Sequence, residues 1–263
     1  KKNILSSGKM LRSRLILYLG HNSSSPQILT RAGAAVDIIH AASLVHDDVI
    51  DGGIIRRGAP TFWKKHGTNG AILFGDLMMF RALSLLVDSD RPDLLKELID
   101  MTGEVCRSEA EQELILRGKP GTWEECVNIA RFKTGSLFAF SAVAGGNGNV
   151  EQANALREAG FLLGTAYQLA DDILDASGNE KLSGKTLGKD YERFKTTAFT
   201  VKKRTPEKPI SYINSLINEE KSNFIAFKQI YYLPKNKPFQ VFLVDLKTEE
   251  ILSKTIFYTN TTN

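Results

Sequence analysis

The feature that most constrains the fold is a long segment, residues 28–51, with the sequence "ILTRAGAAVDIIHAASLVHDDVID". Coiled as a helix, it carries Ala, Val, Ile and Leu on nearly every side, so other helices must surround most of its surface. Residues 70–87, 92–118 and 151–175 repeat this apolar helical pattern. The breakers "SDRP", "GKPGT" and "GGNGN" separate the later segments. The sequence therefore predicts an all-α bundle of antiparallel helices.

Two further signals concern where helices begin and where the pattern ends. Thr122, followed three residues later by Glu125, is typical of a capping box at a helix N-terminus. After the breaker at 205–209, residues 225–263 mix β-branched and aromatic side chains without a helical period. We therefore expect a helical domain over residues 1–224 and a tail over 225–263 whose structure the pattern does not define.

Composition excludes several classes of protein. The chain has 263 residues, of which 42% are hydrophobic, enough for one large core. The net charge of +4 is too small and too scattered to indicate a nucleic-acid partner. Cys106 and Cys126 form neither a disulfide framework nor a metal-ligand spacing. No uninterrupted apolar run reaches the length of a transmembrane segment, and the run Leu15–Leu19 is too short for a signal peptide. The expected location is the cytoplasm.

Two aspartate clusters of the form D-D-x-x-D lie 124 positions apart on apolar helical segments. Their members are Asp47, Asp48, Asp51, Asp171, Asp172 and Asp175. In each cluster the first and last aspartates are four residues apart and share one helix face. Like charges at that spacing destabilise a helix, so cations are expected beside them.

Carboxylate oxygens without a nearby His or Cys pair select Mg²⁺ or Mn²⁺ rather than zinc. Mg²⁺ in proteins is usually shared between carboxylates and substrate phosphates, so the clusters indicate a phosphorylated substrate. Basic residues support this, because each cluster is followed by cations suited to phosphate oxygens. These are Arg56 and Arg57 after the first cluster, Lys185, Lys189 and Lys195 after the second, and Lys9 with Arg12 near the start.

Over about residues 6–200 the sequence resembles the trans-type polyprenyl diphosphate synthases, which include farnesyl, geranylgeranyl and octaprenyl diphosphate synthases. Five motifs occur in the family's order: "GKMLR", "IHAASLVHDDVID" with "RRG", "FKTGSLF", "YQLADDILD" and "GKTLGKDYERFK". The resemblance implies an all-α isoprenoid-synthase fold around a central cavity, with the aspartate motifs facing each other near its mouth. It also implies a homodimer.

The resemblance implies a role for each motif residue. Three Mg²⁺ ions would be held most directly by Asp47, Asp51 and Asp171, with support from Asp48, Asp172 and Asp175. The metals would bind the allylic diphosphate together with Arg56, Lys133, Lys185 and Lys195. Isopentenyl diphosphate would bind beside it on Lys9, Arg12, His40 and Arg57.

The implied reaction is elongation of an allylic diphosphate by isopentenyl diphosphate. As the allylic C–O bond breaks, basic groups and metal ions stabilise the charge on diphosphate. The Thr134 hydroxyl and the Gln168 side-chain oxygen would stabilise the carbocation. In the family, bulky aromatics just before the first aspartate motif limit product length. Ala41, Ala42 and Ser43 occupy that stretch here, which favours a product of C20 or more, as in octaprenyl synthases.

The sequence departs from the family pattern in places. The first basic motif usually reads G-G-K-R-x-R-P, and here Met10 and Ser13 replace Arg and Pro. Phe194 stands where glycine is common, and the tail after about residue 225 matches nothing in the family. Two other classes therefore stay open. A class I terpene cyclase shares the fold but typically has a single aspartate-rich motif. A non-catalytic regulatory subunit typically has damaged aspartate motifs, whereas both are intact here.

Overall fold

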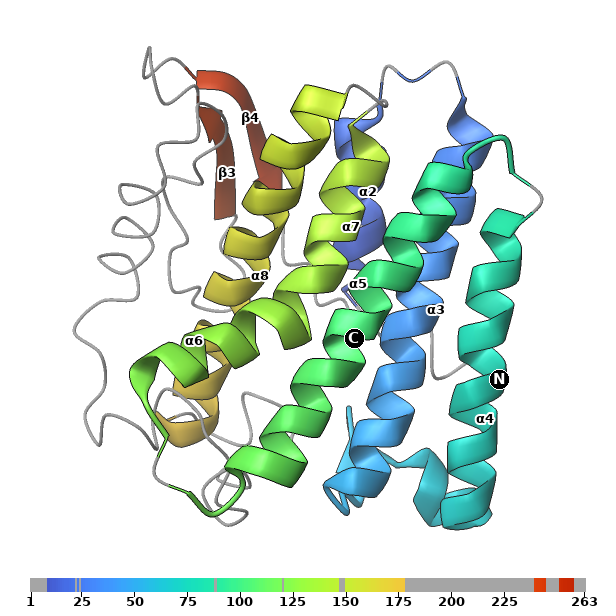
Figure 1. The fold of residues 1–263 in the computed structure, drawn as a ribbon, viewed down its shortest axis with the longest axis vertical. Helices are drawn as coiled ribbons and strands as arrows, with labels where there is room; N and C mark the ends of the chain where they lie inside the picture. The colour runs from blue at the N-terminus through green and yellow to red at the C-terminus, as the bar shows by residue number, and fades with distance from the viewer. Residues whose placement is uncertain are drawn as a thin grey trace.

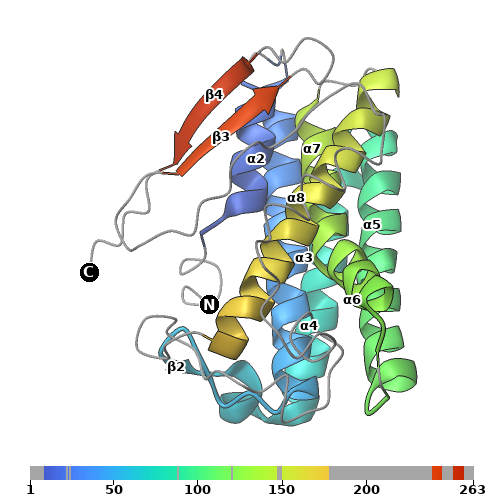
Figure 2. The same ribbon diagram turned by 90° about the vertical axis from the view of Figure 1, so that its left-hand side faces the viewer.

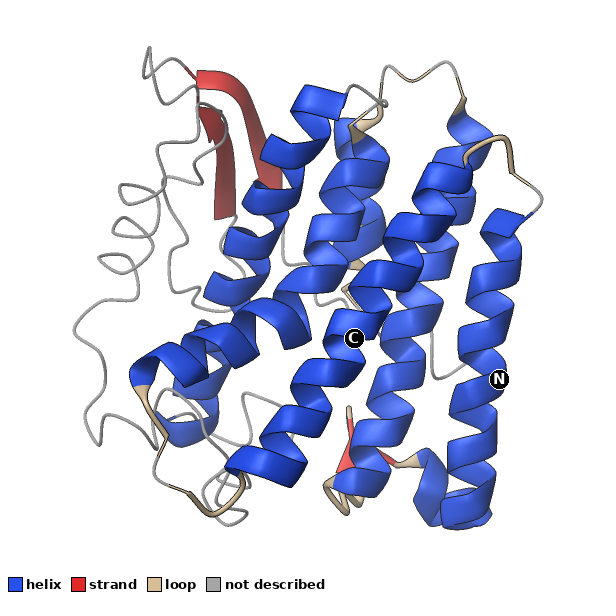
Figure 3. Ribbon diagram, viewed as in Figure 1, coloured by secondary structure: helices blue, strands red, loops and turns tan. Residues whose placement is uncertain are grey.

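The computed structural model of the protein describes residues 9–21, 23, 25–87, 89–119, 121–146, 150–177, 239–244 and 251–257. Helices form nearly all of the described part between residues 9 and 177 (Figure 3). The predicted all-α class is therefore confirmed. The predicted domain boundary near residue 224 lies outside the described residues.

The longest helices of the bundle run up and down one axis, whereas α6 lies obliquely (Figure 1, Figure 2). In chain order the described α-helices are α2 (Leu11–Leu19), α3 (Pro26–Ile50), α4 (Phe62–Val87), α5 (Pro92–Ala110), α6 (Trp123–Ala130), α7 (Ser136–Gly145) and α8 (Val150–Ser177). α4 changes direction at Gly67, whose φ of 80° lies outside the helical region. The predicted capping box is present, with Thr122 and Glu125 bonded to each other's backbone amides at the start of α6.

Two π-helical segments interrupt the regular helices. η1 (Glu111–Leu116) continues α5, and η2 (Arg131–Gly135) joins α6 to α7. π-Turns are rare and frequently occur at functional sites. Their positions therefore mark residues 111–116 and 131–135 for attention.

Short strands complete the described elements. β1 (Ile55–Arg56) and β2 (Ala59–Pro60) pair antiparallel in the loop between α3 and α4. β3 (Phe239–Val244) and β4 (Ile251–Phe257) form a second antiparallel pair, with an irregularity at Leu243 and Val244. Part of the tail, which is rich in β-branched and aromatic residues, thus forms a pair of β-strands.

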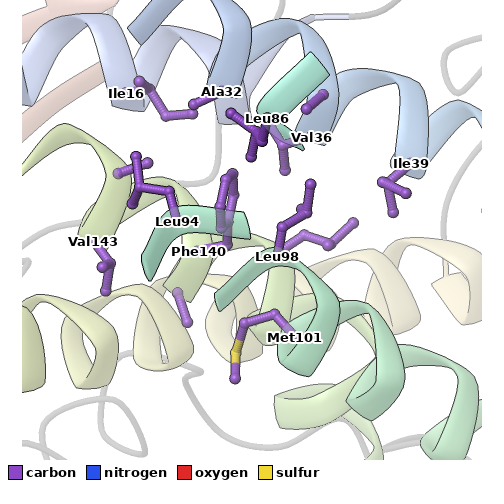
Figure 4. Packing of buried hydrophobic residues seen from close by; sticks show 14 of the residues in the cluster. Ile16, Ala32, Val36, Ile39, Leu86, Leu94, Leu98, Met101, Phe140 and Val143 are labelled. Atoms are coloured by element: carbon purple, nitrogen blue, oxygen red, sulfur yellow. The ribbon is translucent and has the colours of Figure 1, made fainter. Parts of the chain in front are cut away.

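The core lies where α2, α3, α4, α5 and α7 meet. Figure 4 shows side chains from these helices packed together, among them Ile16, Val36, Leu86, Leu98 and Phe140. All five are 0% exposed. α7 is buried along its whole length, which explains why its sequence has no polar face.

Two helices, α3 and α4, are long and apolar enough to cross a membrane. The expectation of no membrane-spanning segment was based on uninterrupted apolar runs, whereas these two helices are identified by their hydropathy averaged over 18 residues. In α3, 50% of the most apolar window is buried inside the bundle, as in the core helix of a water-soluble protein. In α4 only 28% is buried, so this helix presents an apolar outer face.

Candidate active site

The first aspartate cluster occupies the last turn of α3, with Asp51 at the C-cap. Acidic residues are unfavourable there, because the helix macrodipole places partial negative charge at a C-terminus. Asp48 turns inward, is 6% exposed, and accepts a hydrogen bond of 2.9 Å from Arg56 Nε. Asp47 and Asp51 are only partly buried. The helix thus separates one structural carboxylate from two that share the other face.

The hairpin β1–β2 holds the predicted basic pair in place. Arg57 and Gly58 form its two-residue turn, and both have positive φ, 53° and 74°, as a type I′ turn requires. The loop before it is tied to the next helix, because Thr61 Oγ1 and Trp63 Nε1 each donate to the Gly53 carbonyl at 2.7 Å. Arg56 and Arg57 are therefore carried by an anchored turn beside the first cluster.

Lys133, in η2, lies close enough to the first cluster for its charge to interact with Asp47 and Asp51. It forms an ion pair with Glu109 and donates to Gln112 Oε1 at 3.3 Å. Burial acts to lower the Lys133 pKa, but the carboxylates of Asp47, Glu109 and Asp51 outweigh it, and the pKa is raised. The ammonium group therefore stays charged beside Asp47 and Asp51.

Thr134, the next residue of η2, connects to the second cluster. Its hydroxyl donates to Gln168 Oε1 at 2.5 Å, and Gln168 Nε2 donates to Asp172 Oδ1 at 2.8 Å. Asp172 is 8% exposed, and Asp171 is partly buried beside it on α8. η2 thus lies between the two aspartate clusters, with Lys133 serving one and Thr134 the other.

A second group of cations gathers around His40 on α3. The His40 pKa is lowered well below its usual value, first by burial and then by Arg12, Arg57 and Arg56. Arg12 is 9% exposed and lies over the Phe138 ring, 4.8 Å from its centroid. Burial lowers the Arg12 pKa to about 10. A neutral imidazole beside the buried Arg12 and the more exposed Arg56 and Arg57 is a setting that an anionic group would stabilise.

The donor set of the two clusters suits a hard divalent cation. The carboxylates of Asp47, Asp51, Asp171 and Asp172 offer oxygen atoms only, as Mg²⁺ prefers. Within the described residues no three His, Cys, Asp or Glu side chains converge to form a metal site. Mg²⁺ usually keeps several waters and takes further ligands from a bound phosphate, so a few carboxylates from each cluster would be enough to hold it.

The structure brings most of the predicted site residues to two neighbouring places. The first contains Asp47, Asp48, Asp51, Arg56, Lys133, Thr134, Gln168, Asp171 and Asp172. The second contains Arg12, His40 and Arg57. Lys9 is exposed just before α2. Lys185, Lys195 and the side chain of Asp175 lie outside the described residues.

Several residues at these places were not identified from the sequence. Glu109 and Gln112 fix Lys133, and Tyr167 interacts with the charges of Arg12 and Arg57. Asp37 lies close enough to Arg12 for their charges to interact. A charged residue inside an otherwise apolar helical stretch would have been the signal for Asp37. Glu109 and Gln112 gave none, because acidic and amide residues are common on exposed helix faces.

The chain is similar to known proteins along most of its length. Residues 1–233 match the family model described as polyprenyl synthetase. A short chain isoprenyl diphosphate synthase from Methanocaldococcus jannaschii is 33% identical over 76% of this chain and 64% of its own length. An octaprenyl diphosphate synthase from Haemophilus influenzae is 33% identical over 72% of this chain and 56% of its own length.

A solved structure gives the same result for the fold. The polyprenyl synthase from Caulobacter crescentus CB15, complexed with calcium and isoprenyl diphosphate, has a TM-score of 0.72 and 29% identity, covering 82% of this chain and 68% of that one. The chain therefore spans less than two thirds of the length of either curated relative, and slightly more than two thirds of the length of this solved structure. Because the family model covers most of the chain, the protein belongs to the polyprenyl synthetase family.

Proposed function

We propose that the protein is a Mg²⁺-dependent prenyltransferase that lengthens an allylic diphosphate with isopentenyl diphosphate. The observation that carries the proposal is the position of η2. Lys133 lies beside the first aspartate cluster while Thr134 is bonded through Gln168 to the second. A charged ammonium and a polar relay between two carboxylate clusters suit a substrate with a diphosphate at one end and a developing cation next to it.

The chain's own groups would bind the two diphosphates separately. Bound Mg²⁺, held by Asp47, Asp51 and Asp171 with support from Asp48, Asp172 and Asp175, would neutralise charge on the allylic diphosphate as it leaves. Other cations would fix the same group, namely Arg56, Lys133, Lys185 and Lys195. Isopentenyl diphosphate would bind the second group of cations, made of Lys9, Arg12, His40 and Arg57.

The polar relay of η2 suits the cationic intermediate. When the allylic C–O bond breaks, both electrons leave with diphosphate and the allyl group becomes a cation. Thr134 donates its proton to Gln168, so its oxygen lone pairs remain available to face positive charge. The double bond of isopentenyl diphosphate then forms the new C–C bond. Loss of one proton, for which the departed diphosphate is the proposed acceptor, restores the alkene.

The proposed product is long, C20 or more and octaprenyl-like. Ala41 and Ala42, just before the first cluster, are small where bulky aromatic side chains would limit the product. Both are buried and pack with Met78 of α4, near Phe74 and Met79. The two curated relatives carry short-chain and octaprenyl names.

We also propose that the protein is a cytoplasmic homodimer. Leu73, Leu77 and Phe80 of α4 are 68%, 64% and 70% exposed and follow a spacing that places them on one face. A second copy of the chain would cover this face, in keeping with a homodimer. Both cysteines are free, Cys106 exposed and Cys126 buried, which suits a reducing compartment and a cytoplasmic location.

The test is incubation of the protein with Mg²⁺, farnesyl diphosphate and labelled isopentenyl diphosphate, with the products sized by chromatography. We expect a ladder that ends near C40, and its loss in Asp47→Ala. Asp100→Ala is the matched control, since Asp100 is an exposed α5 carboxylate that pairs with Lys96 on the same helix. Absence of incorporation in the wild type would favour a non-catalytic subunit. Cyclic hydrocarbons would favour a terpene cyclase.

A further inference from the structure

The start of α2 needs a hydrogen-bond acceptor from elsewhere in the fold. The first amides of an α-helix have no partner within the helix. Met10, at the N-cap, has a left-handed backbone with φ of 48° and provides no side-chain cap. Ser13 is the third residue of α2, and its side chain is buried. Its amide is therefore one of the donors that would otherwise be buried unpaired.

Asp37 of α3 supplies that acceptor. Its carboxylate accepts hydrogen bonds from both the backbone amide and the hydroxyl of Ser13. The Ser13 hydroxyl also lies 3.2 Å from the Met10 carbonyl, but a carboxylate is the stronger acceptor for its single proton. The two helices approach closely here, because a Cβ added to Gly33 would lie 3.1 Å from Ser13 Cβ. Asp37 is one turn further along the same face of α3.

Asp37 also neighbours Arg12, the residue before Ser13. The Arg12 side chain is nine-tenths buried, and its Nε has no hydrogen-bond partner. The second carboxylate oxygen of Asp37, Oδ2, is likewise buried without a partner. Charge interaction between the two is favourable and partly offsets the effect of burial, which raises the Asp37 pKa. Asp37 is therefore hydrogen-bonded to the backbone of the residue after Arg12, and its charge interacts favourably with that of Arg12.

The sequence explains why this contact is needed in this chain. In the family pattern G-G-K-R-x-R-P the residue after the last arginine is proline, which has no amide hydrogen to satisfy. Ser13 takes that place here and adds two donors, the amide and the hydroxyl. The carboxylate of Asp37 accepts both.

We propose that Asp37 is a positioning residue, which caps α2 through Ser13 and thereby orients Arg12 for the diphosphate of isopentenyl diphosphate. The proposal rests on the proposed function for its ligand, but the cap itself does not. Asp37 is not assigned a contact with substrate. Its effect is expected on one substrate only, because Arg12 lies in the second group of cations and not between the aspartate clusters.

The experiment compares Asp37→Ala, Ser13→Pro and the double variant with the wild type. Calorimetric titration with isopentenyl diphosphate measures binding without turnover, and steady-state kinetics give KM for each substrate. Asp37→Ala should weaken isopentenyl diphosphate binding about tenfold, the usual size of a lost cap, with KM for farnesyl diphosphate within about twofold. Ser13→Pro in the Asp37→Ala background should recover most of this loss, because proline removes the unpaired amide and the hydroxyl together.

Glu97→Ala is the structural control. Glu97 pairs with Arg157 across α5 and α8 at 2.7 Å, so its loss should reduce stability but leave the ratio of the two KM values unchanged. Equal weakening of both substrates in Asp37→Ala, or no recovery in the double variant, would overturn the proposal. If Asp37→Ala does not fold, Asp37→Asn replaces it, with an expected loss of about threefold because one acceptor remains.

A second measurement separates this proposal from the proposed function. Hydrogen exchange at the Ser13 amide should be at least about tenfold faster in Asp37→Ala or Asp37→Asn than in the wild type, with or without substrate. Faster exchange together with no isopentenyl diphosphate binding by the wild type would reject the proposed function and the Arg12 role while keeping the cap. Unchanged exchange would reject the cap whatever the enzyme does.

Discussion

Asp47 and Asp48 are adjacent in the chain, but the 100° step of the helix between them gives their carboxylates different neighbours. Asp48 is buried against Arg56, whereas Asp47 interacts with the charge of Lys133. A buried carboxylate that loses its cation is strongly destabilising, so Asp48 and Arg56 depend on each other. One residue of displacement along α3 therefore separates a carboxylate that maintains the hairpin from one available to a ligand.

His40 should make the stability of the protein sensitive to mild acid. Its folded pKa lies well below the unfolded value of 6.5, first because of burial and then because of Arg12, Arg57 and Arg56. Between these two values the unfolded chain binds a proton that the folded chain does not, so stability falls as pH drops below about 6.5. Urea unfolding of the wild type and His40→Gln at pH 7.5 and 5.5 checks this. The wild type should lose about 1 kcal/mol more than the variant over this interval.

Groups that titrate elsewhere in the protein are common to both chains, so the comparison isolates His40. Identical pH dependence of the two unfolding free energies would contradict a neutral His40 in the folded state.

At the scale of elements, α8 crosses η2 and α7 with almost no space between backbones. A Cβ added at Gly164 would lie 2.4 Å from Gly135 Cα, and one added at Gly160 would lie 2.4 Å from Ala139 Cα. This close crossing brings Thr134 within reach of Gln168, one turn beyond Gly164. The hydrogen bonds from Thr134 through Gln168 to Asp172 therefore depend on Gly135 and Gly164, the two small residues that face each other.

Gly164→Ala should lower the free energy of unfolding by about 2–3 kcal/mol, because the added methyl meets backbone that cannot move aside. Gly103→Ala is the matched control, since nothing lies within 4 Å of its added Cβ on α5. That variant should instead be more stable by about 0.5–1 kcal/mol, the helix preference of alanine over glycine. Urea denaturation of both variants gives the comparison, and changes of the same sign would refute the close crossing.

Elements differ in how far sequence predicts them. The apolar segment 28–51 predicted α3, and the Thr122 and Glu125 pair predicted the start of α6, because both signals are local. The π-turns and the change of direction at Gly67 were not predicted, since they depend on what packs against the helix. The same holds for the site. The charged motifs were visible as residue types, whereas the pairing of Lys133 with Glu109 depends on how α5 meets η2.

At the scale of the whole molecule, the outer face of α4 carries more exposed apolar side chains than an ordinary helix surface does. Leu73, Leu77 and Phe80 form one exposed stripe, and large apolar patches on a protein usually mark an interface. Phe80→Glu should convert the proposed homodimer to a monomer, because a buried unpaired carboxylate costs several kcal/mol at an interface. Light scattering coupled to size-exclusion chromatography measures the mass directly.

Leu17→Glu is the control for Phe80→Glu, because Leu17 of α2 is also exposed, at 50%, and is outside the stripe. It should leave the mass unchanged. A Phe80→Glu protein that remains dimeric, or a wild type that is already monomeric, would exclude this stripe as the dimer interface.

The two π-turns impose a condition on chain length rather than on composition. A π-turn holds one residue more than the α-helical hydrogen bond encloses, so η1 and η2 each contain a surplus position. Deleting a single residue from 131–135 would let α6 run straight into α7, but it would rotate one helix against the other by about 100°. Lys133 could then no longer lie beside the first aspartate cluster while Thr134 is bonded through Gln168 to the second. Related chains should therefore keep the number of residues between Thr122 and Gly145 constant.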